Sequence, residues 1–204
     1  CVTSFFRDQE SYQSLKLALQ SVIKRKNIGD EIRVWVPGCA TGEEAFSIAM
    51  LLAEELGPLS SRYRIQIFGT DINPHSIQFA RKGMYNEASL DKLSKPLRDK
   101  YFVYHKQVIT VSKTLRDMTI FSQHNLLKDP PFIRMDLISC RNLLIYLNPA
   151  SQQRILKNFH YGLVSNGLLF LGRSETIGNL ADAFSEFNKK NKLYIKRNSQ
   201  SFQP

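Results

Sequence analysis

Two glycines and two acids crowd one short stretch, WVPGCATGEE, which runs from Trp35 to Glu44. Gly38 and Gly42 let the backbone pass close to a ligand because neither carries a Cβ that would obstruct the approach. The stretch has neither the G-x-G-x-x-G pattern of a dinucleotide site nor the lysine of a phosphate-binding loop. Glu43 and Glu44 instead place negative charge where a phosphate would lie, which favours a ligand with a cationic group. The alternative is an ordinary strand-to-helix turn whose glutamates complement the helix dipole.

A further acid, Asp71, ends the segment RIQIFGTD, whose apolar residues are typical of a buried strand. A carboxylate at the end of the second strand is placed to accept hydrogen bonds from both hydroxyls of a ribose. A helix cap before Pro74 is the alternative. A nucleoside that is cationic and carries no phosphate suggests S-adenosylmethionine, because its sulfonium and ammonium groups suit Glu43 and its ribose suits Asp71. These acids therefore predict a methyl-donor pocket.

Strands and helices alternate along the chain, and their order must bring these residues together. Hydrophobic spacing predicts helices over residues 8–26, 43–56, 74–82, 91–102 and 149–163. Strands are predicted over residues 32–36, 64–69, 108–111, 117–121, 136–139, 167–172 and 191–196, with a turn over 112–116. This order predicts an α/β fold with a mostly parallel sheet and a ligand site beyond the carboxyl ends of the strands. The Gly38 turn, Asp71 and Cys140–Asn142 all follow strands, so we expect them to meet there.

The composition is that of a globular domain and excludes several other classes of protein. Hydrophobic residues make up 43% of the 204 and charged residues 23%, which provides enough apolar content for one core. No apolar run reaches the length of a membrane helix, and the N-terminus lacks a signal-peptide core, so we expect a cytoplasmic protein without membrane insertion. The three cysteines and four histidines show no disulfide or metal-site spacing, and neither feature is predicted.

The formal net charge of +10 permits a nucleic acid, an anionic membrane or an acidic protein as partner. Basic residues cluster at positions 24–26 and 189–197, and a solvated helix end and strand edge are the alternative explanation. No aromatic residues alternate with the basic ones as in a nucleic-acid-binding sheet, so a nucleic acid is not expected.

Seven segments, in the same order, resemble the CheR family, the methyltransferases that esterify glutamates of bacterial chemoreceptors. They are TSFFRD (3–8), GCATGEEAFSIA (38–49), GTDIN (69–73), ARKGMY (80–85), HNLL (124–127), CRNLLIYL (140–147) and LFLGRSE (169–175). The resemblance covers nearly the whole chain and implies a Rossmann-like catalytic domain that uses S-adenosylmethionine. We expect that domain over residues 1–197, with a small β insertion at about 103–121 and a flexible tail over 198–204.

The resemblance also implies roles for individual residues. The implied cofactor neighbours are Thr3, Arg7, Gly38, Glu43, Asp71, Asn125, Leu126, Arg141 and Asn142. Among them, Glu43 should meet the methionine end, Asp71 the ribose, and Asn125–Leu126 the adenine. Arg7, Arg141 and Tyr146 are the implied catalytic residues, with Tyr146 orienting the acceptor. Core packing is the alternative for Tyr146, and surface ion pairs are the alternative for the two arginines.

The implied partner is an acidic, glutamate-bearing helix of a chemoreceptor, and the domain is expected to act as a monomer. A glutamate side chain has a pKa near 4.3, so it is already an anionic nucleophile at neutral pH and needs no general base. The work of the enzyme is then alignment and exclusion of water. Cys39 and Cys140 follow neighbouring strands, so their thiols are expected close together. Close packing of small residues and a redox switch are the two explanations for them.

Three departures from the family pattern limit the resemblance. The first motif of the family commonly begins with an asparagine two residues before the threonine, and Cys1 stands there. The small helical domain that precedes the catalytic domain in family members is absent, and the stretch from Phe102 to Phe121 is shorter than the β-subdomain that tethers some members to receptor tails. We therefore expect no such tether. The alternatives are a CheR-like domain of a larger signalling protein with another acceptor, or a cofactor-binding module without turnover.

Overall fold

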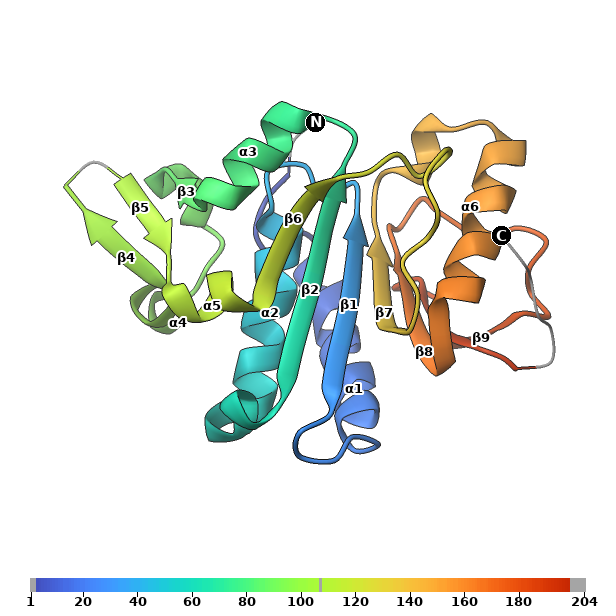
Figure 1. Ribbon diagram of the computed structural model, residues 1–204, viewed down its shortest axis with the longest axis horizontal. Coiled ribbons are helices and arrows are strands. Elements are labelled where there is room, and N and C mark those ends of the chain that lie inside the picture. The colour runs from blue at the N-terminus through green and yellow to red at the C-terminus, as the bar shows by residue number, and fades with distance from the viewer. Residues whose placement is uncertain (1–2, 107, 199–204) are drawn as a thin grey trace.

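The computed structural model describes residues 3–106 and 108–198, so the expectations for Cys1 and for most of the 198–204 tail lie outside it. Its centre is a seven-stranded sheet in the order β6-β2-β1-β7-β8-β10-β9 (Figure 1). The strands are β1 Glu31–Pro37, β2 Arg64–Asp71, β6 Thr119–Gln123, β7 Met135–Cys140, β8 Leu163–Leu171, β9 Phe184–Asn188 and β10 Leu193–Lys196. The first five in this order are parallel, whereas β10 pairs antiparallel with both β8 and β9. The predicted α/β fold with a mostly parallel sheet is confirmed.

Helices cover both faces of this sheet. They are α1 Gln9–Ile23, α2 Glu43–Leu56 and α3 Pro74–Lys82 on one face and α6 Pro149–Gly162 on the other (Figure 1). Successive side chains of a strand point to opposite faces, so Val34 packs with α1 and α2 while Trp35 packs with α6. Local signals start two of the helices: Asn73 and Asn148 cap α3 and α6 by accepting a backbone N–H, and each is followed by proline.

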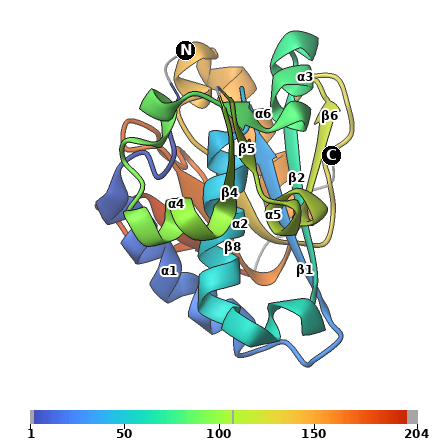
Figure 2. The ribbon, with the colours of Figure 1, turned by 90° about the vertical axis from the view of Figure 1, so that its left-hand side faces the viewer.

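A small antiparallel sheet in the order β3-β5-β4 lies beside the main sheet (Figure 2). Its strands are β3 Met84–Tyr85, β4 Phe102–His105 and β5 Val108–Val111, and α4 Lys95–Tyr101 precedes β4. Short 3-10 helices cover Gly57–Arg62, Glu87–Leu90 and Leu144–Tyr146. The strands β3, β4 and β9 were not predicted from the sequence.

The segment after the small sheet leads back to the main sheet. Residues expected to form a turn make a short helix, α5 Lys113–Met118, which an i,i+4 ion pair between Lys113 and Asp117 supports. The strand after it, β6, pairs in parallel with β2 and is the edge of the main sheet, so it does not belong to the insertion. Long-range pairing with β2 decides this placement, and spacing within the segment does not reveal it.

The topology brings three strand ends to one edge of the sheet. Pro37 lies opposite Thr70 in the register of β1 and β2, and Trp35 lies opposite Ile138 in that of β1 and β7. The turns after these strands therefore meet at the upper edge in Figure 1. Within the described part of the chain, no helix is long and apolar enough to cross a membrane. The same residues contain no cluster of three or more potential metal ligands.

The two buried thiols lie on opposite faces of the sheet. Cys39 packs in the core cluster shared with α1 and α2, whereas Cys140 packs in the cluster shared with α6. Burial raises the pKa of both thiols, which keeps them protonated and unreactive. The geometry therefore favours close packing over a redox switch for this pair.

Candidate functional site

Two adjoining hollows open at the carboxyl edge of the parallel strands and share Gly38, Asp71 and Leu143. The first, of about 480 Å³, is mostly apolar and is also lined by Ile72, His124, Asn125, Leu126, Leu127 and Leu147. The second, of about 880 Å³, is more polar and is also lined by Thr3, Ser4, Arg7, Cys39, Ala40, Glu44, Asn73, Ser76, Arg141, Asn142 and Tyr146. We call these the apolar and the polar hollow. Together they hold every predicted site residue except Glu43.

The loop after β1 and the acid after β2 hold each other in place. Gly38 has φ +67° and Ala40 φ +47°, so the loop turns through the left-handed region that glycine tolerates best. The backbone N–H of Ala40 donates to Oδ2 of Asp71 at 2.9 Å, and that of Asn73 donates to Oδ1 at 2.9 Å. Two backbone amides thus fix the Asp71 carboxylate where the two hollows join.

The two neighbouring glutamates of the loop lie in different surroundings. Glu43 is 6% exposed, accepts a hydrogen bond from the Thr41 hydroxyl at 2.6 Å and does not line either hollow. Its neighbour Glu44 lines the polar hollow and accepts a hydrogen bond from the Ser139 hydroxyl at 2.6 Å. Adjacent helical residues point about 100° apart. Only the docking of α2 on the sheet decides which of the two faces the hollow.

Glu44 is the most perturbed acid of the site. Burial raises the pKa of its carboxyl from 4.5 to about 7, although the positive charge of Arg141 and the Ser139 hydrogen bond act in the opposite direction. The negative charge of Glu175 adds to the rise, and Arg7 opposes it. A carboxyl that is half protonated at neutral pH gains by ionising beside a cationic ligand.

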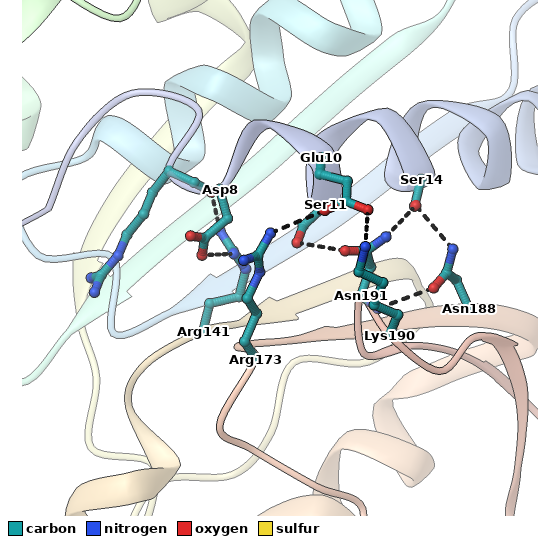
Figure 3. A network of polar contacts seen from close by, with 10 residues as sticks. Asp8, Glu10, Ser11, Ser14, Arg141, Arg173, Asn188, Lys190 and Asn191 are labelled. Carbon is teal, nitrogen blue, oxygen red and sulfur yellow. Dashed lines mark hydrogen bonds and ion pairs between the residues drawn. The ribbon is translucent and has the colours of Figure 1, made fainter.

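Arg141 is buried and forms hydrogen bonds with the N-terminal segment. Its side chain is 1% exposed, and its guanidinium donates to the carbonyl of Arg7 at 2.9 Å and to Asp8 at 2.8 Å (Figure 3). It also lies over the rings of Phe170 and Tyr12, at 4.6 and 5.5 Å from their centroids. Arg141 does form an ion pair with Asp8, but its side chain is buried, so the alternative of a surface ion pair was wrong for this arginine. These donors are directed to the chain itself, so the guanidinium positions the segment that carries Thr3 and Arg7.

A polar network on α1 secures the same segment (Figure 3). The Ser11 hydroxyl donates a hydrogen bond to the Asn191 side chain at 3.1 Å, and the Asn191 amide donates one to the Ser14 hydroxyl at 2.8 Å. The Asn188 amide also donates to the Ser14 hydroxyl. Lys190 pairs with Glu10 at 2.6 Å. Part of the second basic cluster thus ties the turn between β9 and β10 to α1.

Tyr146 and the HNLL segment complete the two hollows. The Tyr146 side chain is 70% exposed at the rim of the polar hollow, which removes core packing as the reason for this residue. The Asn125 side chain accepts the N–H of Leu127 at 3.0 Å, and this tight turn presents Leu126 and Leu127 to the apolar hollow.

The arrangement fits S-adenosylmethionine. A slot lined by leucines and Ile72 suits a purine base, and the fixed Asp71 carboxylate at its mouth suits ribose hydroxyls. In the polar hollow, the carboxyl of Glu44 suits the ammonium group of the methionine part, and the guanidinium of Arg7 suits its carboxylate. The side chains that line the two hollows are therefore chemically suited to this cofactor.

Comparison with known proteins decides the family. Residues 1–193 match the family model described as CheR methyltransferase, SAM binding domain. This chain belongs to the CheR family. The CheR domain is 37% identical over 194 residues to an uncharacterized 104.1 kDa protein of Rhodobacter capsulatus, covering 95% of the chain and 20% of that protein. It is 35% identical to a chemotaxis protein methyltransferase of Salmonella typhimurium, covering 90% of the chain and 63% of that protein.

Solved structures are more distant. A TehB-like SAM-dependent methyltransferase from Corynebacterium glutamicum has 12% identity and a TM-score of 0.46, with 93% of this chain and 97% of that chain covered. The CheR domain spans a fifth of the Rhodobacter relative and just under two thirds of the Salmonella one. The family match confirms the resemblance and S-adenosylmethionine as the cofactor that this domain binds.

Three residues at or behind the hollows were not assigned a role at the site from the sequence. Glu44 and Leu143 line the polar hollow, and Glu175 holds the loop behind it. Glu175 ends the LFLGRSE segment, so its motif was visible although its contacts were not. The signal that was available for Glu44 was only its place next to Glu43.

Proposed function

We propose that this CheR domain transfers a methyl group from S-adenosylmethionine to a glutamate side chain of a chemoreceptor, forming a methyl ester. The observation that carries the proposal is the layout of the polar hollow. Glu44, Arg7 and Tyr146 all line it, and the exposure of Tyr146 supports its assignment to a carboxylate that enters from outside. The printed name of the Salmonella relative, a chemotaxis protein methyltransferase, supports a chemotaxis role.

Each part of the cofactor has a protein group suited to it. We assign Leu126 and Leu127 to the base, Asp71 to the ribose hydroxyls and Glu44 to the ammonium group. Thr3 and Asn142 are assigned to the walls around the donor. When bound, the cofactor supplies an electrophilic methyl group.

The acceptor carboxylate needs orientation rather than deprotonation, since it is ionised at neutral pH. Tyr146 can donate its hydroxyl to one carboxylate oxygen and leave the other oxygen free for attack. Arg7 adds positive charge at the entrance, which draws an acidic helix to the site. Arg141 acts indirectly, by holding the carbonyl of Arg7 and the Asp8 carboxylate. Alignment and water exclusion then account for the rate.

The test is methyl transfer from labelled S-adenosylmethionine to a purified receptor signalling fragment, with base-labile release of methanol as the signature of an ester. Label on the receptor fragment, lost when its acceptor glutamates are changed to alanine, would support the proposal. Cofactor binding without transfer to any protein would point to a binding module. Transfer to a different protein of the same cell would point to another acceptor and would refute the chemoreceptor assignment.

A further inference from the structure

Glu175 is a buried acid that neither hollow uses. It lies in the turn after β8 and is 3% exposed. Its carboxylate accepts hydrogen bonds from the backbone N–H groups of Gly172, Leu144, Leu143 and Asn142 at 2.6, 2.7, 2.8 and 3.0 Å. Within the described residues it has no ion-pair partner, so backbone dipoles alone balance its charge.

Three of these four amides belong to the loop that builds both hollows. That loop follows β7, begins with Arg141 and reaches Tyr146 at its far end. Leu143 lines both hollows, and Asn142 and Tyr146 line the polar one. Asn142 has φ +59°, a conformation that costs energy for a residue with a side chain. Among the described residues, the Glu175 carboxylate is the group that accepts hydrogen bonds from these three successive N–H groups.

Gly172 leaves room for that contact. A Cβ on Gly172 would lie 2.7 Å from Oε2 of Glu175 and 2.9 Å from the backbone nitrogen of Asn142. Position 172, just after β8, must therefore lack a side chain for the Glu175 carboxylate to reach the loop. Because Gly172 has no left-handed backbone requirement, alanine there would act through these contacts, with the Glu175 carboxylate and with the backbone of Asn142.

We propose that Glu175 is a positioning residue for the cofactor and acceptor site, because its carboxylate holds the backbone of residues 142–144 in the shape that both hollows require. This inference deepens the proposed function and rests on it for the identity of the cofactor. The placement of the loop rests on the hydrogen bonds alone.

The charge of Glu175 has a second effect. It helps to raise the pKa of Glu44, after burial and against the lowering effect of Arg141 and the Ser139 hydrogen bond. The charged and titratable groups that interact with Glu44 are Arg7, Tyr12, Cys39, Cys140, Arg141 and Glu175. Removing the Glu175 charge should therefore keep Glu44 ionised to a lower pH. A residue that held the loop only by packing would not make this direct electrostatic contribution.

The test compares Glu175→Gln and Gly172→Ala with wild type, and uses Glu186→Gln on β9 as a control with the same charge change away from the loop. Amide hydrogen exchange of residues 142–144 is measured against the amides of β1 as an internal reference. Calorimetry gives the affinity for S-adenosylmethionine between pH 5.5 and 8.5. For Glu175→Gln we expect at least tenfold faster exchange of the three amides, at least tenfold weaker binding at pH 8, and a binding midpoint at lower pH. Gly172→Ala retains the charge and should show the first two effects without the third.

Two results would overturn the inference. The first is Glu175→Gln with wild-type exchange at residues 142–144 and affinity within twofold. The second is Glu186→Gln with the same losses as Glu175→Gln, because that would show a non-specific effect of charge. If wild type fails to bind S-adenosylmethionine, the proposed function fails, while amide exchange still decides whether Glu175 holds the loop. If Glu175→Gln does not fold, Glu175→Asp decides it in the same way, because it keeps the charge but shortens the reach of the carboxylate to the three amides.

Discussion

Glu44→Gln should make the protein more stable while weakening its binding of the cofactor. Glu44 is half-buried, and its pKa rises from 4.5 in an open chain to about 7 in the fold. Between these two pH values the folded protein binds more protons than the unfolded one, so stability falls as the pH rises through that window. The Ser139 hydroxyl can still donate to the amide oxygen of glutamine, so the substitution keeps the local hydrogen bond.

The size of the gain in stability follows from the shift in the pKa of Glu44. One pKa unit corresponds to about 1.4 kcal/mol, so the full shift would cost about 3 kcal/mol above pH 7. Water in the open hollow screens part of this charge, and we take about 2 kcal/mol as the working value. For a domain of this size, Glu44→Gln should then raise the melting temperature by about 4–8 °C at pH 8. At pH 4.5, where the carboxyl is protonated in the fold, the two proteins should melt together.

Binding should change in the opposite direction. The affinity of wild type for S-adenosylmethionine should fall as the pH drops below 7, by up to about tenfold per pH unit, because the ammonium group then meets a neutral acid. Glu44→Gln should bind at least tenfold more weakly at pH 8, with little dependence on pH. The assays are calorimetric titration and thermal melts at pH 4.5, 6, 7 and 8.

Glu43→Gln is the matched control. Burial also raises the pKa of Glu43, so this variant should gain stability at pH 8 as well. It should nevertheless bind the cofactor within twofold of wild type, because Glu43 lies outside both hollows. The opposite pattern, with binding lost in Glu43→Gln and kept in Glu44→Gln, would refute our reading of how α2 faces the site.

Three further outcomes are expected. Asp71→Asn should weaken binding of S-adenosylmethionine at least tenfold by calorimetry, because an amide has one accepting oxygen in place of two and so cannot accept from both backbone N–H groups, of Ala40 and Asn73, and from the ribose hydroxyls; unchanged affinity would remove Asp71 from the ribose site. Tyr146→Phe should lower the rate of methyl transfer at least tenfold while cofactor affinity stays within twofold, because the side chain is exposed at the rim; full turnover would end its assignment to the acceptor. Treatment with diamide should leave Cys39 and Cys140 unlinked in non-reducing peptide mass spectra, since they lie on opposite faces of the sheet, and a linked peptide would contradict that placement.

The main elements of the fold could be read from short-range rules. The buried strand before Gly38, the proline-started helices and the order of strands and helices all follow from hydrophobic spacing and turn residues, which act over a few residues. The same rules place Gly38 and Asp71 at the ends of parallel strands. That position is enough to predict a ligand site at the carboxyl edge. The type of ligand followed from the acids and from the lack of a phosphate-binding pattern.

The facing of individual side chains and the placement of the edge strand depended on contacts between distant segments. Glu44 rather than Glu43 faces the hollow because α2 docks on the sheet at one particular rotation. Thr119–Gln123 is the edge strand of the main sheet because it pairs with β2, fifty residues away. Arg141 is buried by Tyr12 and Phe170, and Glu175 reaches three amides about thirty residues upstream. Residue type and spacing determined that acids and arginines would gather at this edge, but packing decided which of them face the ligand and which hold the backbone.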